Sequence, residues 1–273
     1  MKGLRVGASE VYQKDIATLK QYRPDYYRLT FHRSLRRAGY EEVSGDDGGN
    51  RIGTKNTAGN SAKLAHSLSR TKSTIFELAL CNDWEYFVSL TLNPNSHDRT
   101  NIKAFKKKLL KWLNNYKQYH DTNIKYLLIP EQHADGAWHM HGLLSGLPAE
   151  HLTAFSLKDK LPLPIRRKLK KGRTIYNWEK YAKAFGYVTV EEILNAEAIS
   201  KYITKYITAD LFKTRIDLND HMYYCSLGLR RAAVIYKNHL TRDFEPDFEN
   251  EYVKVKTFQS LEEAIYHFTD ENE

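Results

Sequence analysis

The sequence predicts an α+β fold with helices packed on a central antiparallel sheet. Runs of β-branched and aromatic residues, typical of strands, alternate with segments whose apolar residues recur at helical spacing. Two of the strands, residues 124–131 and 137–146, are joined by a short turn and are therefore expected to form an antiparallel hairpin. Strands connected by a helix and by a hairpin favour the α+β class.

The individual elements follow from the same patterns. Residues 1–60 are predicted to be a basic N-terminal arm, partly disordered, that ends in a flexible Gly/Asn-rich linker. Residues 61–210 are predicted to form the main domain, and residues 211–273 an acidic C-terminal extension with strand-like pieces and a final short helix. In the main domain we expect helices at 61–82, 99–119, 178–185 and 196–208, strands at 84–93, 124–131, 137–146 and 186–190, and a Pro- and Lys-rich insertion at 158–173.

Composition limits the class of protein. The 273 residues, 41% of them hydrophobic, can build one large domain or two small ones. No apolar run approaches the roughly 18 residues that a membrane helix needs, and the N-terminus has no apolar core of signal-peptide length. Cys81 and Cys225 are far apart and form no metal-type pair, so a disulfide scaffold is excluded and the cytoplasm is the expected compartment.

The distribution of charge favours a polyanionic partner. The net charge of +9 comprises +6 in residues 1–80, +7 in residues 81–210 and −4 in residues 211–273. A basic body suits a nucleic acid, although a basic protein without such a partner has the same charge. Each candidate group of DNA contacts can also be a solvated charged face. The candidates are Arg36 and Arg37 in the arm, Lys107 and Lys108 in helix 99–119, and Arg166, Arg167, Lys170 and Lys171 in the insertion.

The stretch "EQHADGAWHMHG" carries two histidines on one predicted strand. Alternate side chains of a strand share a face, so His139 and His141 point the same way. If Ala134-Asp135-Gly136 is a three-residue hairpin loop with Gly in the left-handed conformation, Glu131 lies opposite His139. Their Cβ atoms are then about 4.5–5.5 Å apart. Glu131, His139 and His141 can therefore converge on one divalent cation, with His133 beside the ligands rather than among them.

This ligand set indicates which metals fit. Two imidazoles and one carboxylate leave coordination positions open, as a catalytic metal requires. The mixed nitrogen and oxygen set suits Mn²⁺ or Mg²⁺ and also tolerates Zn²⁺. The alternative is that both histidines are half-buried residues of an ordinary hairpin that hold no ligand.

The predicted helix 196–208, "AEAISKYITKYIT", places Tyr202 and Tyr206 one turn apart on the same face. Asn195 is predicted to cap its start. A tyrosine hydroxyl can attack a phosphodiester and form a covalent phosphotyrosine. Because its pKa is near 10, it needs a cation that stabilises the developing charge, and Lys205 can contribute. The alternative is a tyrosine pair that only packs on the core.

The motifs "FVSLTLN", "GAWHMHGLL" and "SKYITKYIT" occur in the order that resembles the HUH superfamily of single-strand endonucleases. The tyrosine pair resembles that of the two-tyrosine rolling-circle replication initiators of single-stranded DNA phages and related elements. The resemblance covers residues 84–208 and implies a split ferredoxin-like or RRM-like antiparallel sheet, with the tyrosine helix C-terminal to the His-x-His strand. The residue roles that it implies are His139, His141 and Glu131 as ligands of Mn²⁺ or Mg²⁺, Tyr202 and Tyr206 as nucleophiles, and Lys205 as their supporting lysine.

The resemblance also implies an activity. The enzyme would nick single-stranded or hairpin DNA at a replication origin, stay attached to the 5′ phosphate and leave a 3′-OH that primes rolling-circle replication in the cytoplasm of a bacterial host. "GNRIGTK" lacks P-loop spacing, so a host helicase and polymerase are the expected partners. A two-tyrosine transposase of a mobile element is an alternative, its zinc-ribbon type disfavoured because no second Cys/His cluster occurs. A non-catalytic nucleic-acid-binding module is the other.

One departure makes the two tyrosines inequivalent. Relatives often carry a lysine at the third position after each tyrosine. Here Lys205 follows Tyr202, whereas Ala209 follows Tyr206. Tyr202 is therefore predicted to attack first, with Tyr206 as the second attacker or as a supporting residue.

Overall fold

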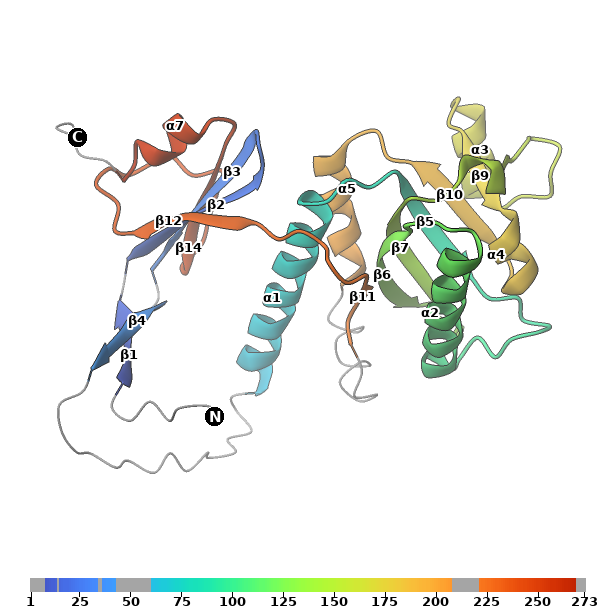
Figure 1. Cartoon of the computed structure of the whole chain (residues 1–273), viewed down its shortest axis with the longest axis horizontal. Coiled ribbons are helices and arrows are strands. Elements are labelled where there is room, and N and C mark those ends of the chain that lie inside the picture. Colours follow the sequence, from blue (N-terminus) through green and yellow to red (C-terminus); the bar gives the residue numbers. More distant parts are fainter. Residues whose placement is uncertain (1–7, 14, 34–35, 43–59, 208–220, 269–273) are drawn as a thin grey trace. The chain divides into compact units, whose positions relative to one another are not determined.

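The computed structural model describes the chain except for residues 1–7, 14, 34–35, 43–59, 208–220 and 269–273. The chain divides into two compact units, coloured by sequence in Figure 1. The larger unit is Asn60–Arg230, and the smaller one combines Met1–Gly59 with Arg231–Glu273. No helix in the described parts of the chain is both long and apolar enough to span a membrane.

The larger unit is built on a seven-stranded antiparallel sheet in the order β11-β6-β7-β5-β10-β9-β8. Its strands are β5 (Tyr86–Thr91), β6 (Lys125–Gln132), β7 (Trp138–Ser145), β8 (Leu152–Ala154), β9 (Ile175–Trp178), β10 (Val188–Glu192) and β11 (Tyr224–Cys225). The strand with the two histidines, β7, is hydrogen-bonded on one side to β6 and on the other to β5. This confirms the predicted α+β class with a central antiparallel sheet.

Helices and two short 3₁₀ segments complete the larger unit. They are α1 (Asn60–Leu80), α2 (Ile102–Tyr119), η2 (Ala149–His151), α3 (Leu163–Lys170), α4 (Glu179–Ala184), α5 (Ala196–Ile203) and η3 (Thr204–Tyr206). The side chain of Asn195 accepts a hydrogen bond from the backbone N–H of Ala198, which confirms the predicted cap of α5.

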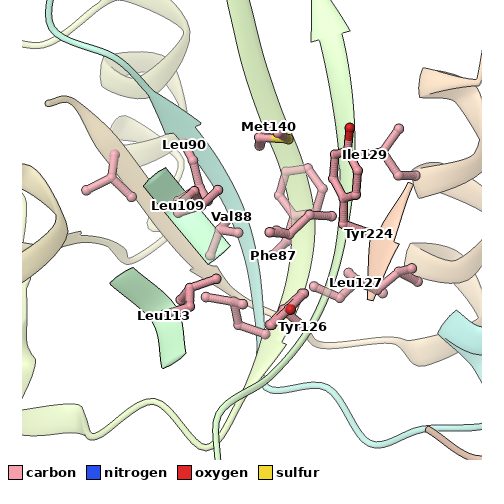
Figure 2. Packing of buried hydrophobic residues seen from close by; sticks show 14 of the residues in the cluster. Phe87, Val88, Leu90, Leu109, Leu113, Tyr126, Leu127, Ile129, Met140 and Tyr224 are labelled. Atoms are coloured by element: carbon pink, nitrogen blue, oxygen red, sulfur yellow. The ribbon is translucent and has the colours of Figure 1, made fainter. Parts of the chain in front are cut away.

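The two faces of the sheet have different neighbours. Alternate residues of β5 point to opposite faces, so Val88 and Leu90 lie on one face and Phe87 on the other. In Figure 2, Leu109 and Leu113 of α2 lie on the side of Val88 and Leu90. Both leucines are at most 1% exposed, and each contributes about 1.5–3 kcal/mol through burial. Phe87 instead contacts side chains of α5 and η3, so the face of Phe87 is the face on which the tyrosines lie.

The smaller unit brings the two ends of the sequence into one five-stranded antiparallel sheet, in the order β12-β2-β3-β14-β13. Alternating residues of its strands, such as Leu19 and Leu29, are fully buried in a separate core. Its elements are β2 (Ile16–Arg23), β3 (Tyr26–His32), β12 (Ala233–Asn238), β13 (Phe248–Glu249), β14 (Val253–Phe258) and α7 (Leu261–Ile265), together with a β1 (Ala8–Gln13) and β4 (Arg36–Glu42) ribbon.

This arrangement differs from the predicted arm and extension. The arm contains regular strands, and these pair with strands of the C-terminal segment. The Tyr and Arg content hid a half-buried pattern, because in β2 the small or apolar Ala17 and Leu19 alternate with Thr18 and Lys20.

Most predicted elements of the larger unit are confirmed to within a few residues, with two differences. The insertion 158–173 contains the helix α3, and α5 ends at Ile203, so that Tyr206 lies in the 3₁₀ turn η3. The hydroxyl of Thr204 donates to the carbonyl oxygen of Lys201 at 2.7 Å. Such a local side-chain bond competes with helix continuation and accounts for the early end.

Candidate active site

The hairpin between β6 and β7 has the predicted register. Glu131 lies opposite His139, and the loop is Ala134-Asp135-Gly136, closed by a hydrogen bond of 2.9 Å from the backbone N–H of His133 to the carbonyl oxygen of Ala137. Gly136 has φ +81°, a conformation that glycine adopts without steric cost. The turn therefore fixes which carboxylate faces the histidines.

Two hydroxyl groups of the neighbouring strand β5 hold the histidine rings. Ser89 lies opposite His141 and Thr91 opposite His139. The Oγ of Ser89 is 2.9 Å from Nδ1 of His141, and Oγ1 of Thr91 is 3.0 Å from Nδ1 of His139. In both rings the Nδ1 atom is thus occupied by a β5 hydroxyl, and Nε2 points elsewhere.

The Nε2 atoms of the two histidines differ in their surroundings. Nε2 of His141 is 2.7 Å from Oε2 of Glu131, and this hydrogen bond lowers the pKa of the carboxyl group against the opposing effect of its burial. Nε2 of His139 is buried and has no hydrogen-bond partner in the described structure. Burial, followed by the charges of His133, His141 and Arg99, lowers the pKa of His139 to about 4. His139 is therefore a neutral imidazole at physiological pH.

His133 lies beside this cluster, as predicted. Its ring stacks on that of His139 with 3.8 Å between centroids, and its Nε2 atom is 3.7 Å from Oε2 of Glu131. It thus covers one side of the His139 ring.

The structure brings both predicted tyrosines to the histidines. The ring of Tyr206 stacks on that of His141 with 4.1 Å between centroids and an interplanar angle of 10°. The hydroxyl of Tyr206 donates to that of Tyr202 at 3.1 Å, and the Nζ atom of Lys205 is 3.6 Å from the centre of the Tyr202 ring. Phe87 packs edge-on against Tyr202, with 5.5 Å between centroids.

Exposure and charge distinguish the two tyrosines. Tyr202 is 42% exposed, whereas Tyr206 is only 8% exposed. Partial burial raises the pKa of Tyr202, but hydrogen bonds from Lys205 and Tyr206, together with the positive charges of Lys205 and Lys168, outweigh it and set the pKa below 10. For Tyr206, burial and the bond to Tyr202 both act upward, and its pKa is far above 10. The accessible tyrosine is the one that ionises more easily.

The donor set can be compared with the needs of a divalent cation. Among the described residues, no three His, Cys, Asp or Glu side chains are already spaced around a common point as a metal would require. In this arrangement Glu131 is hydrogen-bonded directly to His141. The residue types nevertheless fit such an ion, because two neutral imidazoles and a carboxylate share one face and the buried Nε2 of His139 has no other partner.

The predicted DNA contacts lie in different places. Arg166, Arg167, Lys170 and Lys171 are exposed on or next to α3. Lys107 and Lys108 are on α2, which covers the sheet face opposite the tyrosines, so they are not part of the tyrosine site. Arg36 and Arg37 belong to β4 of the smaller unit, and their side chains, like Ala209, lie outside the described residues.

Sequence reasoning missed several residues of the site. It includes Ser89, Thr91 and Phe87 only as part of a strand motif, and it does not reach Glu191 of β10. The alternation Phe87-x-Ser89-x-Thr91, which places three side chains on one face of a strand, is an available signal. Its use requires knowledge that this face carries the histidines.

Comparison with known proteins gives one match. Residues 85–211 match a family model described as replication-associated protein ORF2, over a little under half of the chain. The matched region contains Ser89, Thr91, the histidine hairpin and both tyrosines. The match is consistent with a replication initiator and implies interaction with DNA. No curated protein and no solved structure matches the chain.

Proposed function

We propose that this protein is a site-specific single-stranded DNA endonuclease and strand transferase that initiates rolling-circle replication through a 5′-phosphotyrosine intermediate. The observation that carries the proposal is the stack of Tyr206 on His141, with the Tyr202 hydroxyl bonded to that of Tyr206. It joins the tyrosine helix to the histidine strand at one place on the sheet. The family match over the same residues supports a role in replication.

In the first step, the oxygen of Tyr202 attacks the phosphorus of the scissile phosphodiester. The bond from phosphorus to the 3′ oxygen breaks, and the leaving oxygen takes up a proton and becomes a 3′-OH. The DNA 5′ phosphate is then bonded to the tyrosine. Lys205 favours the ionised nucleophile and contributes positive charge beside the phosphate.

His139, His141 and Glu131 would hold a divalent cation, Mn²⁺ or Mg²⁺. When bound, such an ion polarises the phosphate and offsets its additional negative charge. The hydroxyls of Thr91 and Ser89 can donate to or accept from Nδ1, so they suit either tautomer of each ring. If Nδ1 of His139 carries the proton, the lone pair of the ring lies on the buried Nε2 atom.

The second tyrosine is suited to a later step. Tyr206 is buried and hydrogen-bonded to Tyr202, so it is a poor nucleophile while Tyr202 is free. Once Tyr202 carries the DNA, its oxygen is esterified. Tyr206 then supports the intermediate or attacks a second phosphodiester.

The test is a denaturing-gel assay with single-stranded oligonucleotides of randomised sequence, labelled separately at the 5′ and the 3′ end. With Mn²⁺ or Mg²⁺ we expect the 3′ label to migrate with the protein after boiling in detergent, whereas the 5′ label is released on a fragment that a polymerase can extend. EDTA and the Tyr202→Phe substitution are expected to abolish both signals. If the 5′ label migrates with the protein, or if no adduct forms, the proposed chemistry is wrong.

The same assay separates the alternatives. A two-tyrosine transposase also forms the adduct, but it requires element ends and supports excision and insertion rather than extension from one origin. A non-catalytic nucleic-acid-binding module binds the oligonucleotides without any product that survives denaturation.

A further inference from the structure

A buried carboxylate lies on the tyrosine face of the sheet, and the chemistry above does not use it. Glu191 of β10 is opposite Phe87 of β5, and directly opposite residues share a face. It is therefore on the same face as Phe87, whose ring contacts Tyr202. The side chain of Glu191 is only 9% exposed, and a buried carboxylate normally needs a cationic partner.

The partners of Glu191 come from the basic insertion. Nζ of Lys168 is 2.7 Å and 2.9 Å from its two carboxylate oxygens, and a guanidinium nitrogen of Arg173 is 4.0 Å away. These bonds use two of the three donors of the lysine ammonium group and leave one for another acceptor. The charge of Lys168 is also among those that lower the pKa of Tyr202.

The helix that carries Lys168 has few other means of attachment. None of the eight residues of α3 is buried, and a helix of this length is not stable by itself in water. Residues 163–173, "LPIRRKLKKGR", contain six basic residues and no acidic residue. The single carboxylate of Glu191 therefore neutralises only a small part of the positive charge that it holds against the sheet.

The remaining basic side chains of α3 face away from this ion pair. At 3.6 residues per turn, Arg166, Arg167, Lys170 and Lys171 occupy less than half of the helix circumference, and Lys168 lies outside that arc. All four are exposed. We call them the α3 basic surface.

We propose that Glu191 is a positioning residue that pins Lys168, and with it the α3 basic surface, next to Tyr202, where this surface binds phosphates of single-stranded DNA that flank the scissile bond. The inference rests on the proposed function for the identity of the ligand. It assigns the insertion the task of holding the substrate strand, in addition to the metal ligands and the tyrosines that act on it.

The substitution Glu191→Gln tests the proposal because simple electrostatics predicts the opposite result. Removal of a negative charge beside a polyanion should tighten binding, whereas loss of the pin should weaken it. Binding of a fluorescent single-stranded oligonucleotide is measured by anisotropy in the Tyr202→Phe background, in which no covalent product accumulates. We expect about tenfold weaker binding and a salt dependence of log Kd that is shallower by about one to two phosphate contacts.

Two further variants give the comparison its specificity. Lys168→Met is expected to weaken binding to a similar extent, and the double variant Glu191→Gln/Lys168→Met is expected to bind no more weakly than either single variant, because both changes remove the same ion pair. Glu192→Gln is the matched control. Glu192 is the neighbouring exposed glutamate, bonded to Tyr176, and its substitution should leave binding unchanged or slightly tighter.

The outcomes separate this proposal from the proposed function. Equal or tighter binding by Glu191→Gln overturns the positioning role, and so do losses that add in the double variant. A slower adduct rate at saturating DNA with unchanged Kd, measured with Tyr202 present, also overturns it, because Glu191 would then act on the chemistry. Lys168 is 46% exposed, so Lys168→Met carries the test if thermal unfolding shows that Glu191→Gln does not fold. Failure of adduct formation in the unsubstituted protein contradicts the nuclease and leaves the binding comparison readable.

Discussion

Substitution of Thr91 by valine is expected to weaken metal binding without changing any residue proposed as a ligand. Valine has the shape of threonine but no hydroxyl, so Nδ1 of His139 loses its partner at 3.0 Å. A buried polar atom left without a partner costs about 1–3 kcal/mol. Removing a group that orients a metal-binding histidine typically lowers affinity by about 10–100-fold, which corresponds to about 1.4–2.8 kcal/mol. The two estimates agree.

The assay is calorimetric titration of the full chain with Mn²⁺. Thr91→Val and Ser89→Ala are expected to raise Kd by about 10–100-fold, and Thr91→Ser, which keeps the hydroxyl, should restore most of the affinity. The ring ¹⁵N shifts of His139 provide a second readout, because loss of the Nδ1 partner changes the tautomer balance.

A matched control removes a buried hydroxyl elsewhere in the same sheet. Oγ of Ser226 accepts a hydrogen bond of 2.9 Å from the backbone N–H of Tyr126 and contacts neither histidine. Ser226→Ala should lower stability but leave Mn²⁺ affinity unchanged. The reasoning is refuted if the unsubstituted protein binds Mn²⁺ and Thr91→Val and Ser89→Ala bind it equally well.

Three further changes have defined outcomes. Lys205→Met should raise the pKa of Tyr202, seen in a spectrophotometric titration of the phenolate, and slow adduct formation about tenfold per unit at any pH below that pKa; an unchanged titration contradicts the role of Lys205. Gly142→Ala places a Cβ atom 2.5 Å from a backbone carbonyl oxygen of β6, so it should cost about 1–3 kcal/mol, readable as a lower Tm in thermal unfolding. The pKa of Glu131 is lowered in the folded state, so its ionised form stabilises the fold above the unfolded-state value of about 4.3, and this contribution is lost as pH falls through the folded-state pKa. The stability difference between the unsubstituted protein and Glu131→Gln, measured by denaturant unfolding, should therefore shrink in acid, and a difference that grows there would count against the hydrogen bond to His141.

Local patterns were sufficient to predict the hairpin and the tyrosine pair. Strand alternation and a glycine turn determine that Glu131 faces His139, and helical spacing places Tyr202 and Tyr206 on one side. Each of these inferences concerns residues that are at most a few turns or one loop apart.

Features that depend on distant strands could not be predicted in the same way. Thr91 and His139 become neighbours only because β5 pairs with β7, and Glu191 reaches the site only because β10 pairs with β5. The smaller unit is the extreme case, since Leu19 of β2 pairs with Tyr236 of β12 across more than two hundred residues. Neither periodicity nor composition specifies which strands become neighbours.

The most direct test of the central claim is to identify the residue that carries the DNA. The adduct formed with Mn²⁺ is trimmed with a nuclease, digested with a protease and sequenced by mass spectrometry. We predict a nucleotide phosphate on Tyr202, and its absence in the Tyr202→Phe variant. A modification that is found on Tyr206 in the unsubstituted protein and persists in Tyr202→Phe would contradict the assignment of the first nucleophile. The absence of any modified tyrosine would contradict the proposed endonuclease itself.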